Sequence, residues 1–175
     1  MMIELRKITW DNWEECMGLD VTEEQDDFIA SNEYSLAQSY VALLNDERPP
    51  MTFAIYDGET LVGFMMMSYD AAGEGEYSGE PYYDIVRFMI DKNHQNKGLG
   101  KKAMTKLLEY IKSFPQGEAA AVYLSYAQNN IIARRLYESF GFVETGGLHI
   151  GDEYIATGGQ YADGDDVEVV ARLAL

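Results

Sequence analysis

The feature that most constrains the fold is a pair of apolar segments joined by Asp57-Gly58. Residues 51–56 precede this dipeptide and residues 61–69 follow it, and both segments are rich in aromatic and apolar side chains. An Asp-Gly pair between two such segments predicts a tight β-hairpin, because glycine readily adopts the positive φ that the turn requires. The sequence therefore predicts antiparallel strand pairing in the first half of the chain.

The second half alternates short apolar segments with segments of helical periodicity. A strand is predicted over residues 82–90, and apolar residues at helical spacing predict a helix over residues 97–114 that Pro115 and Gly117 end. The remaining elements expected here are a strand at 119–126, a helix at 130–140, and strands at 142–150 and 167–173. A hairpin followed by strand-helix-strand units predicts an α/β (α+β mixed) fold. We expect one domain over residues 1–175, with a central mixed, mostly antiparallel sheet flanked by helices on both faces.

The N-terminal third is predicted to hold a strand and short helices. Residues 3–9 alternate apolar and polar side chains, and Asp11 is expected to be the N-cap of the next helix. Thr22 and Gln25 match the capping-box pattern, and Ser35 is expected to open a helix over residues 36–44 that Pro49 ends. Two segments rich in glycine and acidic residues, 71–81 and 151–166, are predicted to be exposed loops.

The net charge of -17 at pH 7 restricts the partners that the chain can bind. A negative surface repels phosphate backbones and anionic lipids, so we expect no nucleic acid and no membrane as partner and favour cationic small molecules. The charge is uneven, because six lysines and only two acids lie between Asp91 and Lys112. This basic segment predicts either a solvated helix face or a site for a polyanionic ligand.

Cysteine content and the N-terminal residues favour the cytoplasm. Cys16 is the only cysteine and cannot form an internal disulfide, and the first residues lack the basic-then-apolar pattern of a secretory signal. The longest apolar run, residues 61–67, is far shorter than the ~20 residues that span a bilayer. We therefore expect a cytoplasmic protein without a membrane span.

A glycine-rich segment, residues 95–101, lies between a predicted strand and a predicted long helix. Glycine at a helix start lets the backbone approach a ligand, and free N–H groups with the positive end of the helix dipole attract phosphate. A tight turn without a ligand is the alternative. Residues 98–103 also match the dinucleotide fingerprint G-x-G-x-x-A, which would indicate a nicotinamide-dependent oxidoreductase. In that fold the first glycine follows the strand almost directly, whereas seven residues separate Ile90 from Gly98, so the spacing argues against it.

A second motif begins 35 residues after Gln95. Residues 130–142 fit N-x-x-A-x-x-L-Y-x-x-x-G-F, and residues 95–100 fit Q-x-x-G-x-G. Together, on the expected strand-helix-strand-helix order, they resemble the GNAT superfamily of acetyltransferases. The resemblance implies a GNAT-like domain that uses acetyl-CoA as cosubstrate without a metal and transfers its acetyl group to an amine.

The resemblance also implies a role for each matching position. Backbone groups of Phe88, Met89 and Ile90 would run along the pantetheine arm. Asn130 would contact the cofactor near that arm, and Tyr137 would lie beside the sulfur. The pyrophosphate would be held by Gln95, Asn96, Lys97, Gly98, Leu99, Gly100 and Lys101. Asn96 replaces a glycine common in the family, but asparagine tolerates positive φ better than most residues, so the loop is expected to form.

Acetyl transfer to an amine needs a base and benefits from an acid. An alkyl ammonium has a pKa near ~10 and must lose a proton before it attacks a thioester. Asp84 is the leading candidate for the base because it shares a strand face with Val86 and Phe88, and Glu80 and the N-terminal acids are alternatives. A phenol beside the sulfur can protonate the departing thiolate, which is the role expected of Tyr137.

Further segments narrow the resemblance and suggest an acceptor. Residues 12–16, 24–32, 34–37 and 87–91 resemble the bacterial spermine/spermidine N-acetyltransferase group, which implies a polyamine substrate. Independently, residues 14–27 hold seven acids and no basic residue, which suits a polycation but also fits two solvated helix faces. Aminoglycosides, amino acids and protein lysines are alternative acceptors, and a CoA-binding sensor without turnover is the alternative of another class. A homodimer is an open alternative to a monomer.

Overall fold

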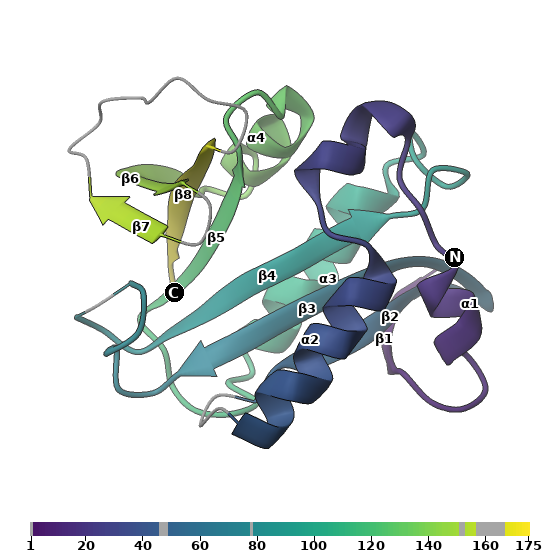
Figure 1. Cartoon of the computed structure of the whole chain (residues 1–175), viewed down its shortest axis with the longest axis horizontal. Coiled ribbons are helices and arrows are strands. Elements are labelled where there is room, and N and C mark those ends of the chain that lie inside the picture. The colour runs from purple at the N-terminus through teal and green to yellow at the C-terminus, as the bar shows by residue number, and fades with distance from the viewer. Residues whose placement is uncertain (1, 46–48, 78, 151–152, 157–166) are drawn as a thin grey trace. The chain divides into compact units, whose positions relative to one another are not determined.

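The structure is a computed structural model that describes residues 2–45, 49–77, 79–150, 153–156 and 167–175 (Figure 1). Its elements are β1 (Ile3–Lys7), α1 (Trp13–Met17), the 3-10 helix η1 (Glu23–Phe28), α2 (Asn32–Asn45), β2 (Met51–Asp57), β3 (Thr60–Asp70), β4 (Tyr82–Ile90), α3 (Leu99–Ile111), β5 (Ala121–Ala127), α4 (Ile131–Glu138), β6 (Val143–Ile150), β7 (Glu153–Ala156) and β8 (Val167–Ala174). The chain divides into two compact units. The first is Met1–Tyr69 with Val86–Gln116, and the second is Asp70–Ile85 with Gly117–Leu175.

Strand pairing confirms the predicted fold class. Over the described residues, eight strands are hydrogen-bonded in the order β1-β2-β3-β4-β5-β8-β6-β7. The pairs β1–β2, β2–β3, β5–β8, β6–β8 and β6–β7 are antiparallel, and β4–β5 is parallel. The fold is therefore α/β (α+β mixed), with a mixed and mostly antiparallel sheet.

The predicted hairpin joins β2 to β3 in the first unit. Asp57 pairs with Thr60, so Asp57 ends the strand and the two-residue loop begins with Gly58 at a φ of 64°. This positive φ is the conformation for which glycine was expected here. The hairpin is confirmed, with the turn one residue later than the dipeptide.

Helices cover both faces of the sheet in the first unit (Figure 1). On one face, Cys16 of α1, Ile29 after η1 and Leu36 of α2 pack on a cluster that includes Phe64 and Met66. On the other face, α3 packs against β1, and Tyr110 meets the ring of Phe53 edge to face at 5.2 Å. Strand residues alternate between the two faces, so a single sheet supplies two apolar cores.

The first helices begin at other residues than predicted. Asn12, not Asp11, is the N-cap of α1, because a turn at Thr9 delays the helix and the Asn12 side chain accepts the Thr9 N–H at 2.8 Å. Helix α2 begins at Asn32 rather than after Ser35, and the Ser31 hydroxyl accepts the N–H of residue 34 at 3.2 Å. Ser35 is buried within the helix. The predicted capping box of Thr22 and Gln25 is confirmed, and the Gln25 side chain accepts the Thr22 N–H at 3.5 Å.

The second unit is built around β5, which pairs with residues 82–85 of β4 and with β8. Tyr77, Tyr82 and Tyr123 pack with Ala121 and Val170 in its core. Helix α4 and strands β6 and β8 lie close to their predicted positions. The predicted loop 151–166 is corrected in one place, because residues 153–156 form β7 and pair with β6. Residues 151–152 and 157–166 of that loop lie outside the described residues.

Candidate functional site

The predicted site residues fall into two groups, one in each compact unit. The first unit holds Phe88, Met89 and Ile90 at the end of β4, together with the loop of residues 95–98 and the first turn of α3. The second unit holds Asp84, Asn130 and Tyr137.

The glycine-rich loop has the backbone conformation that a phosphate site requires. Asn96 has a φ of 60° and Gly98 a φ of 73°, so both lie in the left-handed region, and α3 therefore begins only at Leu99. The expectation that Asn96 tolerates positive φ is confirmed. No side chain of the described residues caps the helix, which leaves its first N–H groups directed at the space before it. A Cβ added at Gly98 would meet nothing within 4 Å, so a ligand can approach the backbone there. The loop and helix start thus fit the pyrophosphate of a nucleotide-like ligand.

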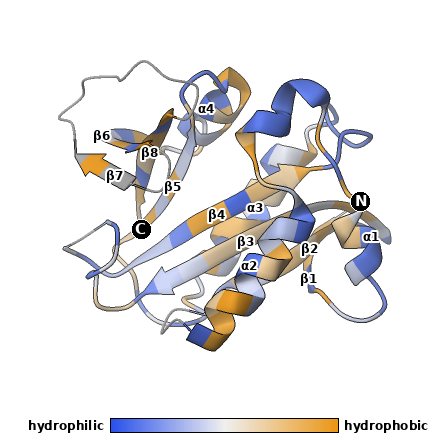
Figure 2. Ribbon diagram, in the orientation of Figure 1, coloured by the Kyte–Doolittle hydropathy of each residue, from blue (hydrophilic) through white to orange (hydrophobic). Residues whose placement is uncertain are grey.

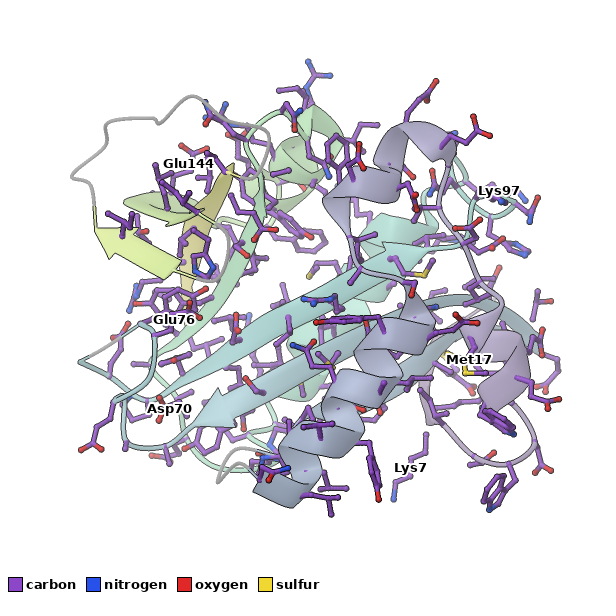
Figure 3. All side chains as sticks on the ribbon, in the orientation of Figure 1. Lys7, Met17, Asp70, Glu76, Lys97 and Glu144 are labelled. Carbon is purple, nitrogen blue, oxygen red and sulfur yellow. The ribbon has the colours of Figure 1, made fainter. Side chains whose placement is uncertain are left out.

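The lysines around this loop divide into paired and unpaired groups. The Lys92 ammonium lies 2.7 Å from Asp20, and Lys106 lies 3.1 Å from Glu109, so carboxylates of the chain already neutralise both. Lys97 is exposed on the loop, and its ammonium donates to a backbone carbonyl (Figure 3). Lys101 is exposed on the first turn of α3 and has no ion pair among the described residues. Only part of the predicted basic segment is therefore available for an anionic ligand.

The side chain of Gln95 binds the protein itself. Its amide donates to the Ile90 carbonyl at 2.9 Å and to the side-chain oxygen of Gln25 at 2.8 Å. Gln95 therefore joins the end of β4 to helix η1, 70 residues earlier in the chain. Its predicted cofactor contact would have to come from the backbone, because both side-chain N–H groups have acceptors.

Two further contacts connect the same segments. The Asp91 carboxylate accepts the N–H of Asp20 at 3.1 Å, and the N–H of Lys92 donates to the Asp20 carbonyl at 2.8 Å. The hydrogen bond between the Asp20 carboxylate and the Lys92 ammonium is the main reason that the pKa of Asp20 is lowered and the pKa of Lys92 is raised. The acidic segment and the glycine-rich loop are thus held together. Sequence reasoning missed Gln25 as part of this arrangement, since only its capping pattern is visible locally.

The last residues of β4 combine a buried and a partly open surface. Met89 and Ile90 are buried, and Phe88 is half-buried. Met89 belongs to the core under α2, where the buried Asn32 side chain lies 3.9 Å from its sulfur. These side chains fix the strand, and a role of its backbone along a pantetheine arm stays a prediction.

Asn130 caps helix α4. Its side-chain oxygen accepts the N–H of Ala133 at 3.0 Å, so a side chain that can cap the helix has a structural role at this position. The oxygen is occupied by the cap, and the NH₂ group is the part of the side chain that could contact a cofactor.

Tyr137 is buried on α4, with 8% of its surface exposed. Its ring lies 5.6 Å from the ring of Tyr126 and 5.9 Å from that of Phe142. Burial raises the pKa of Tyr137, and the charge of Glu168 raises it further, so the phenol stays protonated through neutral pH. Its hydroxyl has no hydrogen-bond partner within the residues that the structure describes. A protonated, uncommitted hydroxyl is what a proton donor needs.

The two carboxylates considered as bases lie in different surroundings. Glu80 accepts two hydrogen bonds from Arg172, at 2.7 and 3.0 Å, and one from the Tyr123 hydroxyl at 3.1 Å. These donors, Arg172 first, lower the pKa of Glu80 and make it a poor proton acceptor. Asp84 is half-buried in β4 and pairs with Tyr123 of β5. The pKa of Tyr77 is raised, first by the burial of its ring and then by the negative charge of Asp84. These contacts argue against Glu80 as the base, and the role of Asp84 stays a prediction.

An aromatic cluster beside Asp84 was not visible in the sequence. Tyr77 comes from the predicted loop 71–81, stacks on Tyr123 at 4.5 Å and shares a 3.1 Å hydrogen bond with His149. No periodicity marks Tyr77, and the rings meet only because three separate segments converge in the second unit.

Family comparison agrees with the two motifs. A model of the Acetyltransferase (GNAT) family matches residues 3–142. A protein named probable spermine N(1)-acetyltransferase from Bacillus subtilis subsp. natto is 33% identical over 156 residues, which is 89% of this chain and 97% of that protein. The spermine/spermidine N(1)-acetyltransferase of Bacillus subtilis strain 168 is 32% identical over the same shares of both chains. The chain belongs to the GNAT acetyltransferase family, and it transfers an acetyl group from acetyl-CoA to an amine.

Solved structures share the fold. The spermidine N-acetyltransferase of Vibrio cholerae, in complex with CoA and spermine, has a TM-score of 0.68 and 19% identity, and the match covers 99% of this chain and 95% of that one. NAA60 of Arabidopsis thaliana, in complex with a bisubstrate analogue, has a TM-score of 0.68 and 18% identity, with 99% of both chains covered. At these identities the likeness establishes the fold and leaves the acceptor open.

The described residues also bear on the predictions about a membrane span and a metal site. Every helix there is too short or too polar to cross a membrane. The same residues contain no group of three or more histidine, cysteine or acidic side chains that could hold a metal ion.

Proposed function

We propose that this acetyltransferase acts on a polyamine such as spermine or spermidine, by direct transfer from acetyl-CoA. The observation that carries the proposal is the identity of 33% and 32% to two Bacillus relatives over 97% of their length, because the names of both specify spermine. A NatC complex bound to Gag peptide and the ribosomal-protein-S18-alanine N-acetyltransferase of Escherichia coli share the fold at 13% and 15% identity, so the fold alone does not choose the amine.

The charge of the first unit supports a polycationic acceptor. Asp20 is the one acid of residues 14–27 with an ion pair among the described residues. The other six are exposed and have none: Glu14, Glu15, Glu23, Glu24, Asp26 and Asp27. Unneutralised carboxylates attract a cation with several charges more strongly than one with a single charge. The Gln25 to Gln95 bridge connects this acidic segment to the glycine-rich loop.

Two side chains of the second unit are proposed to move protons. Asp84 would accept a proton from the substrate ammonium, directly or through water, so that the free amine can attack the thioester carbon. A C–N bond then forms and the C–S bond breaks. The Tyr137 hydroxyl would donate its proton to the departing thiolate sulfur. Its raised pKa keeps that proton in place until the sulfur becomes basic.

An acceptor panel tests the proposal. The protein is incubated with acetyl-CoA and spermine, spermidine, free lysine, an aminoglycoside or a lysine-containing peptide, and release of free thiol is followed. We expect the highest kcat/KM with a polyamine, and a polyamine KM that rises with salt because attraction to exposed acids is screened over about 10 Å at 0.1 M. A higher kcat/KM for another amine would overturn the polyamine assignment. Tight acetyl-CoA binding without turnover on any amine would favour a CoA sensor.

A further inference from the structure

Glu168 is a half-buried carboxylate of the second unit that has no ion pair within the described residues. Strand β8, which carries it, is apolar except for Glu168 and Arg172 (Figure 2). Two other glutamates of this unit are half-buried, and each has an arginine partner. Arg172 contacts Glu80 at 2.7 Å, and Arg134 contacts Glu144 at the same distance. A half-buried charge without such a partner lowers stability, so stability does not explain Glu168.

The Ser125 hydroxyl donates a hydrogen bond to the Glu168 carboxylate at 2.5 Å. That length is at the short end of the range for a hydroxyl bound to a carboxylate. A serine hydroxyl has one proton and two lone pairs, so this bond uses the proton and leaves the oxygen able to accept. The Ser125 side chain makes no other hydrogen bond within the part of the chain that the structure describes. Its oxygen can therefore accept an N–H of a substrate.

Strand register places Ser125 and Asp84 on one face of the sheet. Asp84 pairs with Tyr123, and Ser125 is two residues further along β5, where side chains return to the same face. Spacings of about 3.3 Å per residue and about 4.8 Å between strands put the Cα atoms of Ser125 and Asp84 about 8 Å apart. Glu168 lies on this face too, because it pairs with Ala127 on the other side of β5. One nitrogen between Ser125 and Asp84 can thus reach an oxygen of each.

Amide formation removes two protons from the attacking nitrogen. The ammonium loses one before it attacks the thioester carbon. The attack gives a tetrahedral intermediate whose nitrogen is positively charged, and this nitrogen loses another proton before the C–S bond breaks. Asp84 is the proposed acceptor of the first proton, and a carboxylate that has become a carboxylic acid carries one O–H and is no longer a base. The reaction therefore needs a second proton acceptor near the same nitrogen.

We propose that Glu168 accepts the second proton, through the Ser125 hydroxyl. The Ser125 oxygen takes the proton from the positively charged nitrogen of the intermediate, while its own proton passes to Glu168. The C–S bond then breaks, the carbonyl forms again, and the Tyr137 hydroxyl protonates the sulfur. The proton on Glu168 returns to the Tyr137 phenolate, directly or through water, and Asp84 releases its proton to solvent. The net change is one proton released for each amide formed.

Electrostatics connects Glu168 to Tyr137. Burial raises the pKa of Tyr137 and the negative charge of Glu168 raises it further, so the two groups are close enough for their charges to interact. A phenolate near an ionised carboxylate is unfavourable, and the phenolate is by far the stronger base, so the proton moves from Glu168 back to Tyr137. This proton path rests on the proposed roles of Asp84 and Tyr137, and it holds for any amine acceptor.

Initial rates of Glu168→Gln test the proposal, measured with the amine that has the highest kcat/KM in the acceptor panel. Glutamine keeps the shape and an oxygen that accepts the Ser125 hydroxyl, but it is not a base. The kcat is expected to fall at least about tenfold, with acetyl-CoA affinity and the free energy of unfolding nearly unchanged. Glu144→Gln is the matched control, because Glu144 is also half-buried and accepts a hydroxyl of β5, that of Tyr126 at 2.9 Å. Its kcat should stay within about twofold of the unmodified value.

A double variant tests the path through Ser125. Ser125→Ala should also lower kcat, and the protein with both Ser125→Ala and Glu168→Gln should be no slower than Glu168→Gln alone, because both changes interrupt one proton path. Effects that multiply would contradict the relay. A kcat of Glu168→Gln within about twofold of the unmodified value would overturn the proposal. So would a loss in Glu168→Gln that Asp84→Asn does not share, since Glu168 would then take the first proton. The acceptor panel judges the polyamine assignment separately.

Discussion

Tyr137→Phe is expected to remove catalysis and leave the fold intact. The hydroxyl has no hydrogen-bond partner among the described residues, so its loss should change the free energy of unfolding by no more than about 0.5 kcal/mol. The ring that packs against Tyr126 and Phe142 is retained. If the hydroxyl protonates the thiolate, kcat should fall by about 10² to 10⁴, which corresponds to roughly 3 to 5 kcal/mol in the barrier.

Tyr126→Phe is the matched control, because it is expected to lower the stability of the fold and to leave kcat nearly unchanged. The Tyr126 hydroxyl donates to Glu144 at 2.9 Å. Removing this hydrogen bond to a charged group that Arg134 also contacts should cost about 1 to 2 kcal/mol, and hence about 2 to 8 °C in Tm for a chain of this size. Since Tyr126 has no assigned role at the sulfur, kcat should stay within about twofold of the unmodified value.

The assay combines urea unfolding, calorimetric titration with acetyl-CoA and initial rates of thiol release. Acetyl-CoA affinity is expected to be nearly constant in both variants. The reasoning is refuted if Tyr137→Phe folds, binds acetyl-CoA and turns over at the original rate, since Tyr137 would then be a packing residue. It is also refuted if the two variants lose activity equally.

Three further predictions follow from the described contacts. The methyl group of Gly98→Ala meets no neighbouring atom, so this variant should lose only about 1 to 2 kcal/mol of folding stability through its left-handed backbone. Gly98→Asp adds a negative charge at the same place and should bind acetyl-CoA at least tenfold more weakly than Gly98→Ala by calorimetry. Equal affinities of the two variants would contradict a phosphate at this loop. Gln25→Ala and Gln95→Ala should show a coupling of about 1 kcal/mol in a double-mutant cycle of unfolding, and strictly additive effects would mean that their 2.8 Å bond contributes nothing. Because Arg172 lowers the pKa of Glu80, this pair stabilises the fold above the ordinary glutamate pKa of about 4.3, and the stabilisation is lost as the pH falls. The free energy of unfolding of Glu80→Gln should therefore fall less between pH 5 and pH 3 than that of the unmodified chain. Equal falls in both proteins would argue against the pair.

Elements set by local pattern were predictable from the sequence. The strand Tyr82–Ile90 and the hairpin at Gly58 depend on alternation and turn chemistry within a few residues, and both occur as expected. The glycine-rich loop was equally local, although α3 begins later than its apolar spacing indicates. The left-handed conformations of Asn96 and Gly98 cannot continue a helix, so the loop takes the first residues of the apparent helical pattern.

Features that depend on distant partners were not predictable. Ser35 directly precedes the apolar Leu36, whereas Ser31 is followed by the polar Asn32 and Glu33. The helix nevertheless begins at Asn32, whose buried side chain donates to the Cys16 carbonyl at 2.8 Å. Strand β7 lies in a segment rich in glycine and acids and is a strand only because β6 pairs with it.

The candidate site shows the same division between local and distant information. The motif identifies Gln95, but not that its side chain binds Gln25, 70 residues earlier. The sequence allows Glu80 as a base, but Arg172, 92 residues later, binds both of its oxygens. No periodicity reports such contacts, because they arise when segments far apart in the chain meet.

The most direct test of polyamine acetylation is a competition in a single tube. Equal concentrations of spermine, spermidine, free lysine, an aminoglycoside and a lysine-containing peptide share a limiting amount of acetyl-CoA, and mass spectrometry measures how the acetyl groups divide. At equal concentrations this division gives the ratio of the kcat/KM values, which is the measure of specificity. The proposal predicts that spermine and spermidine together take most of the acetyl groups. Acetylation mainly of another amine, or an even division among all five, would contradict it.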